Sequence, residues 1–136
     1  MKNLSSYAVL LLAAGEGRRF GGEKLGAIID GESVIALSAS ALANTGCVMR
    51  AAVLSSATLH HAPRLEALGF EILLNPDAAS GLSSSIRCAV AWAQMNGADA
   101  ALLALADMPF VTSTHLLRLC ARFEHSTVGV AYSHSG

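Results

Sequence analysis

A stretch rich in glycines and cations follows the first apolar run of the chain. Residues 10–25 read LLLAAGEGRRFGGEKL. Backbone N–H groups at glycines are not obstructed by side chains and can converge on phosphate oxygens. Gly15, Gly17, Gly21 and Gly22 supply such groups, and Arg18, Arg19 and Lys24 add positive charge. These residues predict a polyphosphate ligand; the alternative is a solvated glycine-rich turn without a ligand.

Two common phosphate-binding loops do not fit this stretch. The dinucleotide fingerprint G-x-G-x-x-G needs a glycine where Phe20 stands. The G-x-x-x-x-G-K-[ST] loop nearly appears in residues 17–24, but Glu23 intrudes and Leu25 replaces the metal-binding hydroxyl. The loop therefore belongs to another class.

A single carboxylate, Asp107, follows a wholly apolar run at residues 100–105. Burial penalises an unpaired charge there unless a cation compensates it, and Mg²⁺ on a nucleotide triphosphate is such a cation. The alternative is that Asp107 caps a helix or forms a turn, since Pro109 follows closely.

A third segment, NPDAASGLSSSI at residues 75–86, places serines after Gly81; by itself it predicts only a serine-rich helix N-terminus.

The elements expected around these segments alternate strand and helix. Apolar runs predict strands at 7–13, 50–54, 70–74, 100–105 and 127–132. Helical spacing predicts helices from the cap Ser33 to 44–46, from Thr58 to Leu68, from Gly81 to Met95 and from the cap Thr112 onward. Their expected inward faces are Val34, Leu37, Ala41 and Leu42 in the first, and Leu82, Ile86, Ala89, Val90 and Ala93 in the third. The pattern predicts an α/β fold, a three-layer α/β/α arrangement with a mostly parallel, Rossmann-like sheet.

In such a sheet, ligands bind in the loops that follow the carboxyl ends of the strands. The expected functional loops are therefore 15–24, 55–58, 75–85 and 106–112.

Composition restricts the class of protein. The 136 residues are 53% hydrophobic and 14% charged, which predicts one globular domain over residues 1–136. A net charge of -1 gives no broad basic surface for nucleic acid or anionic lipid. No apolar run approaches the roughly 18 residues that cross a bilayer. Cys47, Cys88 and Cys120 are expected to be buried, reduced thiols in a cytoplasmic protein, and the five histidines carry no predicted role.

Three segments in the same order resemble one family. LAAGEGRRFGGEKL (12–25), NPDAASGLSSSI (75–86) and LALADMPFV (103–111) are similar to the MobA-like NTP transferase family, which includes the molybdenum-cofactor cytidylyl- and guanylyltransferases. The resemblance implies a fold like that of the nucleotide-diphospho-sugar transferases. It covers nearly the whole chain, although members usually continue for several tens of residues beyond the strand expected to end at Tyr132.

The resemblance also implies an activity and a set of site residues. Ala14 and the GLSSSI and DMP pieces are similar to the cytidylyl branch, which transfers CMP from CTP to molybdopterin-type molybdenum cofactor and releases pyrophosphate. Catalytic roles fall on Arg19, Lys24 and Asp107, with Mg²⁺ on Asp107. Nucleotide-binding roles fall on Leu12, Ala13, Ala14, Gly15, Gly17, Arg18, Asn75, Gly81, Ser83 and Ser85.

Other functions stay open at this point. The chain could be a truncated nucleotide-binding module without turnover, or a guanylyl or sugar-phosphate nucleotidyltransferase. A homodimer, or a contact with a molybdoenzyme, is the expected macromolecular partnership.

Overall fold

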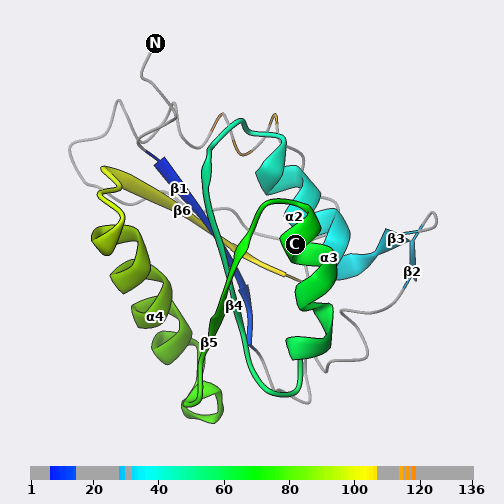
Figure 1. Cartoon of the computed structure of the whole chain (residues 1–136), viewed down its shortest axis with the longest axis vertical. Coiled ribbons are helices and arrows are strands. Elements are labelled where there is room, and N and C mark those ends of the chain that lie inside the picture. Colours follow the sequence, from blue (N-terminus) through cyan, green and yellow to red (C-terminus); the bar gives the residue numbers. More distant parts are fainter. Residues whose placement is uncertain are drawn as a thin grey trace.

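Four parallel strands form the sheet at the centre of the described structure (Figure 1). The computed structural model describes residues 7–14, 28–29 and 32–106, together with Thr114, Leu116 and Arg118. The strands of this sheet are β1 (Tyr7–Ala13), β4 (Met49–Leu54), β5 (Glu71–Leu74) and β6 (Ala100–Leu105). The labelled helices are α2 (Val34–Ala43), α3 (Ala62–Ala67) and α4 (Leu82–Met95), and the 3-10 turns are η2 (Leu59–His61) and η3 (Ala78–Ser80). The four strands lie within one residue of their predicted bounds.

The sheet has the order β5-β4-β1-β6, and each neighbouring pair of strands is parallel. Helix α4 lies on one face of the sheet, and α2 and α3 lie on the other (Figure 1). This arrangement confirms the predicted three-layer α/β fold.

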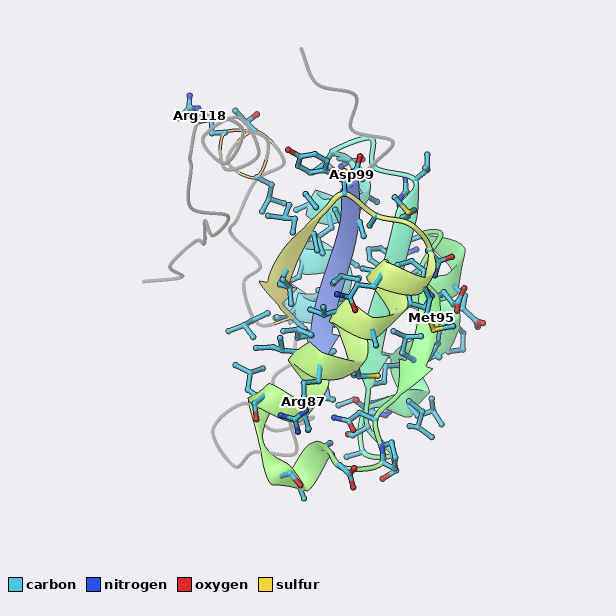
Figure 2. All side chains as sticks on the ribbon, turned by 90° about the vertical axis from the view of Figure 1, so that its left-hand side faces the viewer. Arg87, Met95, Asp99 and Arg118 are labelled. Carbon is cyan, nitrogen blue, oxygen red and sulfur yellow. The ribbon has the colours of Figure 1, made fainter. Side chains whose placement is uncertain are left out.

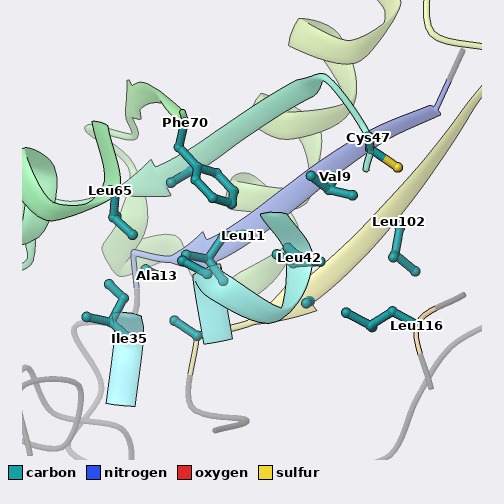
Figure 3. Close-up of a cluster of buried hydrophobic side chains, with 14 of the residues drawn as sticks. Val9, Leu11, Ala13, Ile35, Leu42, Cys47, Leu65, Phe70, Leu102 and Leu116 are labelled. Atoms are coloured by element: carbon teal, nitrogen blue, oxygen red, sulfur yellow. The ribbon is translucent and has the colours of Figure 1, made fainter. Parts of the chain in front are cut away.

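Strand β1 is buried along its whole length because other strands flank it and helices cover both of its faces. Successive side chains point to opposite faces of a strand. Val9 and Leu11 join the core cluster beneath α2 and α3, which Figure 3 shows with Leu42 of α2 and Leu65 of α3. Ala8, Leu10 and Leu12 join a second cluster beneath α4. The continuous apolar sequence of β1 thus reflects burial on two sides.

Helix α2 begins and ends where its sequence signals predict. The Ser33 Oγ accepts a hydrogen bond from the Ala36 N–H at 3.3 Å, which satisfies one of the free amides of the first turn. The predicted inward face is partly wrong. Leu37 and Ala41 are only half-buried, whereas Ile35 and Ala39 are completely buried in the core.

The predicted helix from Thr58 to Leu68 is two shorter pieces, the 3-10 turn η2 and the six-residue α3. Pro63 lies in the first turn of α3, where its missing N–H costs no helical hydrogen bond. Because Pro63 has no N–H to donate to the carbonyl of Leu59 four residues earlier, a continuous α-helix does not run back to Thr58, and α3 begins at Ala62. Gly69 follows α3 with φ +88°, as expected of a helix stop.

Helix α4 is rolled about its axis relative to the prediction. Ala89 and Ala93 are buried as expected, but Leu82 is 53% exposed and Ile86 is 36% exposed. Ser84 and Ser85 are buried in their place. The hydrogen bonds of those two serines, described below, hold this side of the helix inward.

One short element was not predicted from the sequence, the antiparallel pair of β2 (Ile28–Ile29) and β3 (Glu32–Ser33). Near the other end of the chain, Thr114, Leu116 and Arg118 are helical, and Leu116 is buried in the α2 side of the core. The strand predicted at 127–132 lies outside the described residues. Within the described part of the chain, no helix combines the length and apolar character needed to cross a membrane.

The described cysteines are free thiols, and their predicted burial holds for one of the two. Cys47 is buried and Cys88 is half-buried. Cys120 lies outside the residues described.

Candidate functional site

The four parallel strands end at one edge of the sheet, which we call the C-terminal edge and which lies toward the bottom of Figure 1. The register pairs Ala13 with Leu54, Leu54 with Leu74, and Leu12 with Leu105. The residues directly after the strands are Ala14, Ser55, Asn75 and Ala106. All four predicted functional loops therefore leave the sheet at this common edge.

The end of β1 offers main-chain groups to this edge. Leu12, Ala13 and Ala14 are 7%, 2% and 3% exposed, and their side chains belong to the two core clusters. Of the predicted nucleotide contacts on β1, these three residues can therefore contribute backbone atoms but not side chains.

The predicted phosphate-binding and metal-binding segments leave from neighbouring strands. The Ala106 N–H donates a hydrogen bond to the Leu12 carbonyl at 3.0 Å, which continues the pairing of β6 with β1 for one residue. Adjacent strands lie about 4.8 Å apart, so the ends of β1 and β6 lie about one strand spacing apart. Gly15, Gly17, Arg18, Arg19, Lys24 and Asp107 themselves lie outside the described residues.

Ala106 is also held from the helical layer. The hydroxyl of Ser38 on α2 donates to the Ala106 carbonyl at 2.8 Å, and its oxygen is 3.1 Å from the Val34 carbonyl one turn earlier. Ser38 and Ala106 are 4% and 2% exposed. Both backbone polar groups of Ala106 are thus bound, the N–H by β1 and the carbonyl by α2.

A buried polar cluster lies where β5 leads to α4. The side-chain amide of Asn75 donates to the Ser84 Oγ at 2.9 Å and to the Ser85 Oγ at 3.0 Å. Its Oδ1 accepts a hydrogen bond from the Asp77 N–H at 2.9 Å. The Ser84 hydroxyl is directed at the carbonyls of Gly81 (2.9 Å) and Asp77 (3.0 Å). Both amide protons of Asn75 are consumed within the protein, so its described role is to tie the loop to the first turn of α4.

Gly81 and Ser83 form the exposed side of the same segment. Gly81 has φ +111° and ψ -179°, a backbone conformation essentially restricted to glycine. No side chain caps α4 at this residue, and Ser83 is exposed. Among the predicted nucleotide contacts with described side chains, Ser83 is the one whose hydroxyl faces solvent.

The loop after β4 closes on itself. The Thr58 Oγ1 accepts a hydrogen bond from the Ser55 N–H at 2.9 Å, and the Thr58 N–H donates to the Ser55 carbonyl at 3.1 Å. Both residues are buried, with exposed fractions of 1% and 0%.

Two histidines follow that loop. The rings of His60 and His61 lie 4.1 Å apart, and the Nε2 of His61 is buried without a hydrogen-bond partner among the described residues. Burial, and secondarily the neighbouring His60, lower the pKa of His61 below its usual value of 6.5. The neutral form of His61 is therefore the one that fits the fold.

The described part of the C-terminal edge relies on neutral groups. Hydroxyls and one amide make its hydrogen bonds, and the exposed cation Arg87 lies in the second turn of α4 (Figure 2). No group of three or more His, Cys, Asp or Glu residues that could hold a metal occurs among the residues described.

Two residues that shape this edge, Ser38 and Ser84, were not among the predicted site residues, although Ser84 belongs to the serine run expected to supply donors and acceptors there. The Ser38 hydroxyl bonds a carbonyl distant in the sequence, and the Ser84 hydroxyl bonds carbonyls across a turn. A serine within a helical pattern does not indicate such a partner. The sign in the sequence was the run of serines at 83–85 itself.

Comparison with known proteins identifies a family. The family model described as the MobA-like NTP transferase domain matches residues 9–136. No curated protein matches the chain.

Two solved structures share the fold. The crystal structure of the Mycobacterium tuberculosis rv0371c homologue from Mycobacterium sp. strain JC1 matches with a TM-score of 0.76 and 26% sequence identity over 90% of this chain and 62% of that one. A nucleotidyl transferase from Methanothermobacter thermautotroptrophicus, Mth528, matches with a TM-score of 0.62 and 22% identity over 85% of this chain and 56% of that one. The chain thus spans about three fifths of the length of these two structures.

Proposed function

The chain belongs to the MobA-like NTP transferase family, and from this premise we propose that it transfers CMP from CTP to a molybdopterin-type acceptor and releases pyrophosphate. The general class, a nucleotidyltransferase, follows from the family. The nucleotide and the acceptor are the parts of the proposal that require a test.

One observation carries the proposal, the parallel pairing of β1 with β6 up to Leu12 and Ala106. This pairing brings Ala14 and Ala106, the residues that precede the glycine-rich segment and Asp107, to one edge of the sheet on neighbouring strands. A nucleoside triphosphate needs both partners at once, because its phosphates carry several negative charges and its metal ion needs an oxygen ligand.

The reaction is a substitution at the α-phosphorus of the nucleotide. A phosphate oxygen of the acceptor forms a new P–O bond there, the bond between the α- and β-phosphates breaks, and pyrophosphate leaves. Arg19, Lys24 and the glycine amides of residues 15–22 would neutralise the charge that grows on the phosphates. The protein's contribution is to position the two substrates and stabilise that charge, without a covalent nucleophile.

Asp107 is the proposed protein ligand of the metal. A carboxylate is a hard oxygen donor of the kind that Mg²⁺ prefers, and it follows Ala106, whose backbone is held on both sides. When bound, Mg²⁺ would supply positive charge that offsets the phosphate oxygens.

The segment at 75–85 is the proposed site for the nucleoside. Gly81 leaves the backbone uncovered at the C-terminal edge, and Ser83 offers a free hydroxyl. Asn75 and Ser85 shape this turn from beneath through their hydrogen bond. CTP is preferred over GTP in this proposal because Ala14 and the GLSSSI piece are similar to the cytidylyl branch.

The proposal is tested by measuring pyrophosphate release with Mg²⁺ and each common nucleotide, with molybdenum cofactor as acceptor. We expect release with CTP to exceed release with GTP. Equal or reversed preference would contradict the cytidylyl assignment, and release only with a sugar 1-phosphate as acceptor would make the protein a sugar nucleotidyltransferase. Nucleotide binding without any release would identify a binding module.

The metal assignment has a matched control on β6. Asp107→Ala should abolish metal-dependent release, whereas Asp99→Ala should not, because Asp99 is exposed and precedes the opposite end of the same strand (Figure 2). An undiminished rate in Asp107→Ala, compared with the Asp99 control, would remove the metal role from Asp107.

A further inference from the structure

The asparagines of the chain differ in the residue that follows each of them. Asn3, Asn44, Asn75 and Asn96 are followed by Leu4, Thr45, Pro76 and Gly97. An asparagine can lose its side-chain amide without an enzyme when the next backbone nitrogen attacks that amide. Glycine places no Cβ beside this nitrogen. Asn96–Gly97 is therefore the pair whose local chemistry favours the reaction.

The Asn96–Gly97 pair connects the end of α4 to β6. Figure 2 labels two residues close to it, Met95, which is 85% exposed, and Asp99, which is also exposed. Asn96 and Gly97 are themselves exposed. A Cβ added at Gly97 would meet no atom within 4 Å, and φ is +76° there. Solvent water therefore has access to the pair.

Hydrogen bonds of the last turn of α4 engage both groups that would react. The Asn96 Nδ2, which must leave, donates to the Trp92 carbonyl at 2.8 Å. The Gly97 N–H, whose nitrogen must attack, donates to the Gln94 carbonyl at 3.1 Å. These bonds lie at an exposed helix end, where helices fray and local opening costs little free energy. The reaction thus requires opening of this turn but not of the whole fold.

Asn44 is a matched residue at which the reaction is disfavoured. It is the C-cap of α2 with φ -75° and ψ -3°, close to the -95° and 7° of Asn96 at the end of α4. The next residue, Thr45, is 5% exposed, and its hydroxyl donates to the Leu42 carbonyl at 2.6 Å. This buried, β-branched side chain holds the nitrogen that would have to attack. Asn75 is excluded by chemistry, since Pro76 has no N–H.

We propose that Asn96 is a site of spontaneous deamidation, which occurs when the last turn of α4 opens. The Gly97 nitrogen forms a bond to the Asn96 Cγ, the Cγ–Nδ2 bond breaks, and ammonia leaves with the proton of the Gly97 N–H. Water then opens the cyclic imide at one of its two carbonyls. The products are aspartate and isoaspartate, and in isoaspartate the main chain runs through the former side-chain carbonyl carbon.

The products change the chain where α4 leads into β6. A carboxylate at residue 96 lies at the C-terminal end of a helix, where the dipole disfavours negative charge, and it cannot donate to the Trp92 carbonyl as Nδ2 does. Isoaspartate adds a CH₂ group to the main chain, next to the bond from the Ala98 N–H to the Ala93 carbonyl (3.0 Å). These changes lie at the opposite end of α4 from the proposed nucleotide site. The inference is therefore independent of the proposed function.

Ageing of the folded full chain at mildly alkaline pH tests the proposal. Peptide mapping by mass spectrometry measures amide loss at each asparagine, and enzymatic methylation detects isoaspartate. We expect amide loss at Asn96 to exceed that at Asn44, with isoaspartate among the products, and Asn75 to stay intact. Asn96→Gln should remove the signal, because its longer side chain closes the ring far more slowly. Amide loss at Asn96 no faster than at Asn44 would overturn the proposal.

The opening step has its own test in urea, above the unfolding midpoint. Amide loss at Asn96 should be faster there than in the folded chain, because the bonds to Trp92 and Gln94 are gone. Equal rates would show that no opening is needed, and loss in urea alone would show that the folded chain is not a substrate. Gly97→Ala should slow the reaction in urea, where the strain of a positive φ has no influence. An unchanged rate in that variant would contradict the role of Gly97.

The effect on the fold is measured on the aged protein. Anion exchange separates the modified chain, which carries one more negative charge than the fresh chain. We expect its urea midpoint to be lower than that of the fresh protein. An unchanged midpoint would contradict the predicted disturbance at the end of α4.

Discussion

The two edges of the central sheet are fastened by different chemistry. At the N-terminal edge, where β4 begins, the guanidinium of Arg50 donates to three carbonyls: Cys47 (2.7 Å), Leu68 (2.8 Å) and Ala43 (3.3 Å). At the C-terminal edge, the fastening groups are the neutral side chains of Ser38 and of the Asn75 cluster. Among the described residues, charged side chains make hydrogen bonds at the first edge, Arg50 to three carbonyls and Glu71 from the Trp92 Nε1–H at 2.9 Å, and uncharged ones shape the second.

The difference follows from what each edge must accommodate. Two of the Arg50 acceptors lie at the ends of α2 and α3, where helix carbonyls are unpaired and the helix dipole favours a cation. The partners of Arg50 are thus carbonyls of the protein itself. At the C-terminal edge the described hydrogen bonds use no cation, which is consistent with a proposed anionic ligand that takes its positive partners from residues 15–24.

The largest effect on stability is expected at the N-terminal edge. Arg50→Met keeps much of the apolar stem but removes the guanidinium from three carbonyls, of which Ala43 keeps the Gly46 N–H as a donor. We therefore expect the free energy of unfolding to fall by about 2–4 kcal/mol. Urea denaturation followed by circular dichroism measures it. The matched control is Arg87→Met at an exposed position of α4, with an expected change within about 0.5 kcal/mol.

A second variant tests the Arg50 hydrogen bonds by adding a side chain next to its guanidinium. A Cβ added at Gly69 would lie 2.8 Å from the Arg50 Nη1, and φ at Gly69 is +88°. Gly69→Ala should therefore also destabilise the fold. If neither variant lowers stability more than Arg87→Met does, Arg50 does not close this edge.

The next effect is expected at the C-terminal edge, in the Asn75 cluster. Asn75→Ala removes both donors to Ser84 and Ser85 and leaves the Asp77 N–H without its acceptor, with an expected loss of about 1–3 kcal/mol. We also expect weaker CTP binding, which Arg50→Met should not show. Asn96→Ala, which breaks an exposed bond at the opposite end of α4, is the control for both measurements.

A smaller loss of stability is expected on substitution of Gly81 or Gly46, and the two substitutions should differ in their effect on CTP binding. A Cβ would meet no atom within 4 Å at Gly81 or at Gly46, and φ is +111° and +86° there. Alanine at either position should lower stability by about 1–2 kcal/mol through backbone strain alone. Because Gly81 lies at the C-terminal edge and Gly46 at the other, only Gly81→Ala should also weaken CTP binding in a calorimetric titration.

The smallest effect concerns pH. The pKa of His61 is lower in the folded chain than its usual value of 6.5, because burial and His60 disfavour its charged form. The contribution of neutral His61 to the free energy of unfolding is fully present above pH 6.5. It is lost as the pH falls through the folded pKa, since the unfolded state binds the proton more tightly. Urea midpoints at several pH values should show this loss in the wild type and less of it in His61→Gln. An identical pH profile in that variant would contradict the assignment to His61.

Local patterns predicted most of the architecture. Apolar runs gave the strands to within one residue, and the Ser33 cap, Gly69 and the glycine-rich stretch marked where elements begin, end or leave the sheet. These features depend on neighbouring residues, through backbone geometry, capping and burial. The shortening of the second helix to η2 and α3 is an intermediate case, because Pro63 was visible but the boundary that it sets was not.

The roll of α4 could not be predicted in the same way. Leu82 and Ile86 have the more apolar side chains, and by hydropathy they should have been buried instead of Ser84 and Ser85. The bonds from Asn75 satisfy the two serines inside the fold, so their burial carries no penalty. Asn75 is nine residues from Ser84, and helical periodicity does not report such a partner.

By itself the amino-acid sequence determined the alternation of strands and helices, the burial of β1 on both faces, and the position of the glycines and cations after it. Only the tertiary structure decided which strands are neighbours, and so that Ala14 and Ala106 lead to adjacent points of one edge. It also decided that Ser38 and Arg50 act on carbonyls of other elements. The reason is physical: local elements follow from nearby residues, whereas a hydrogen bond to a distant carbonyl forms only after the layers have packed.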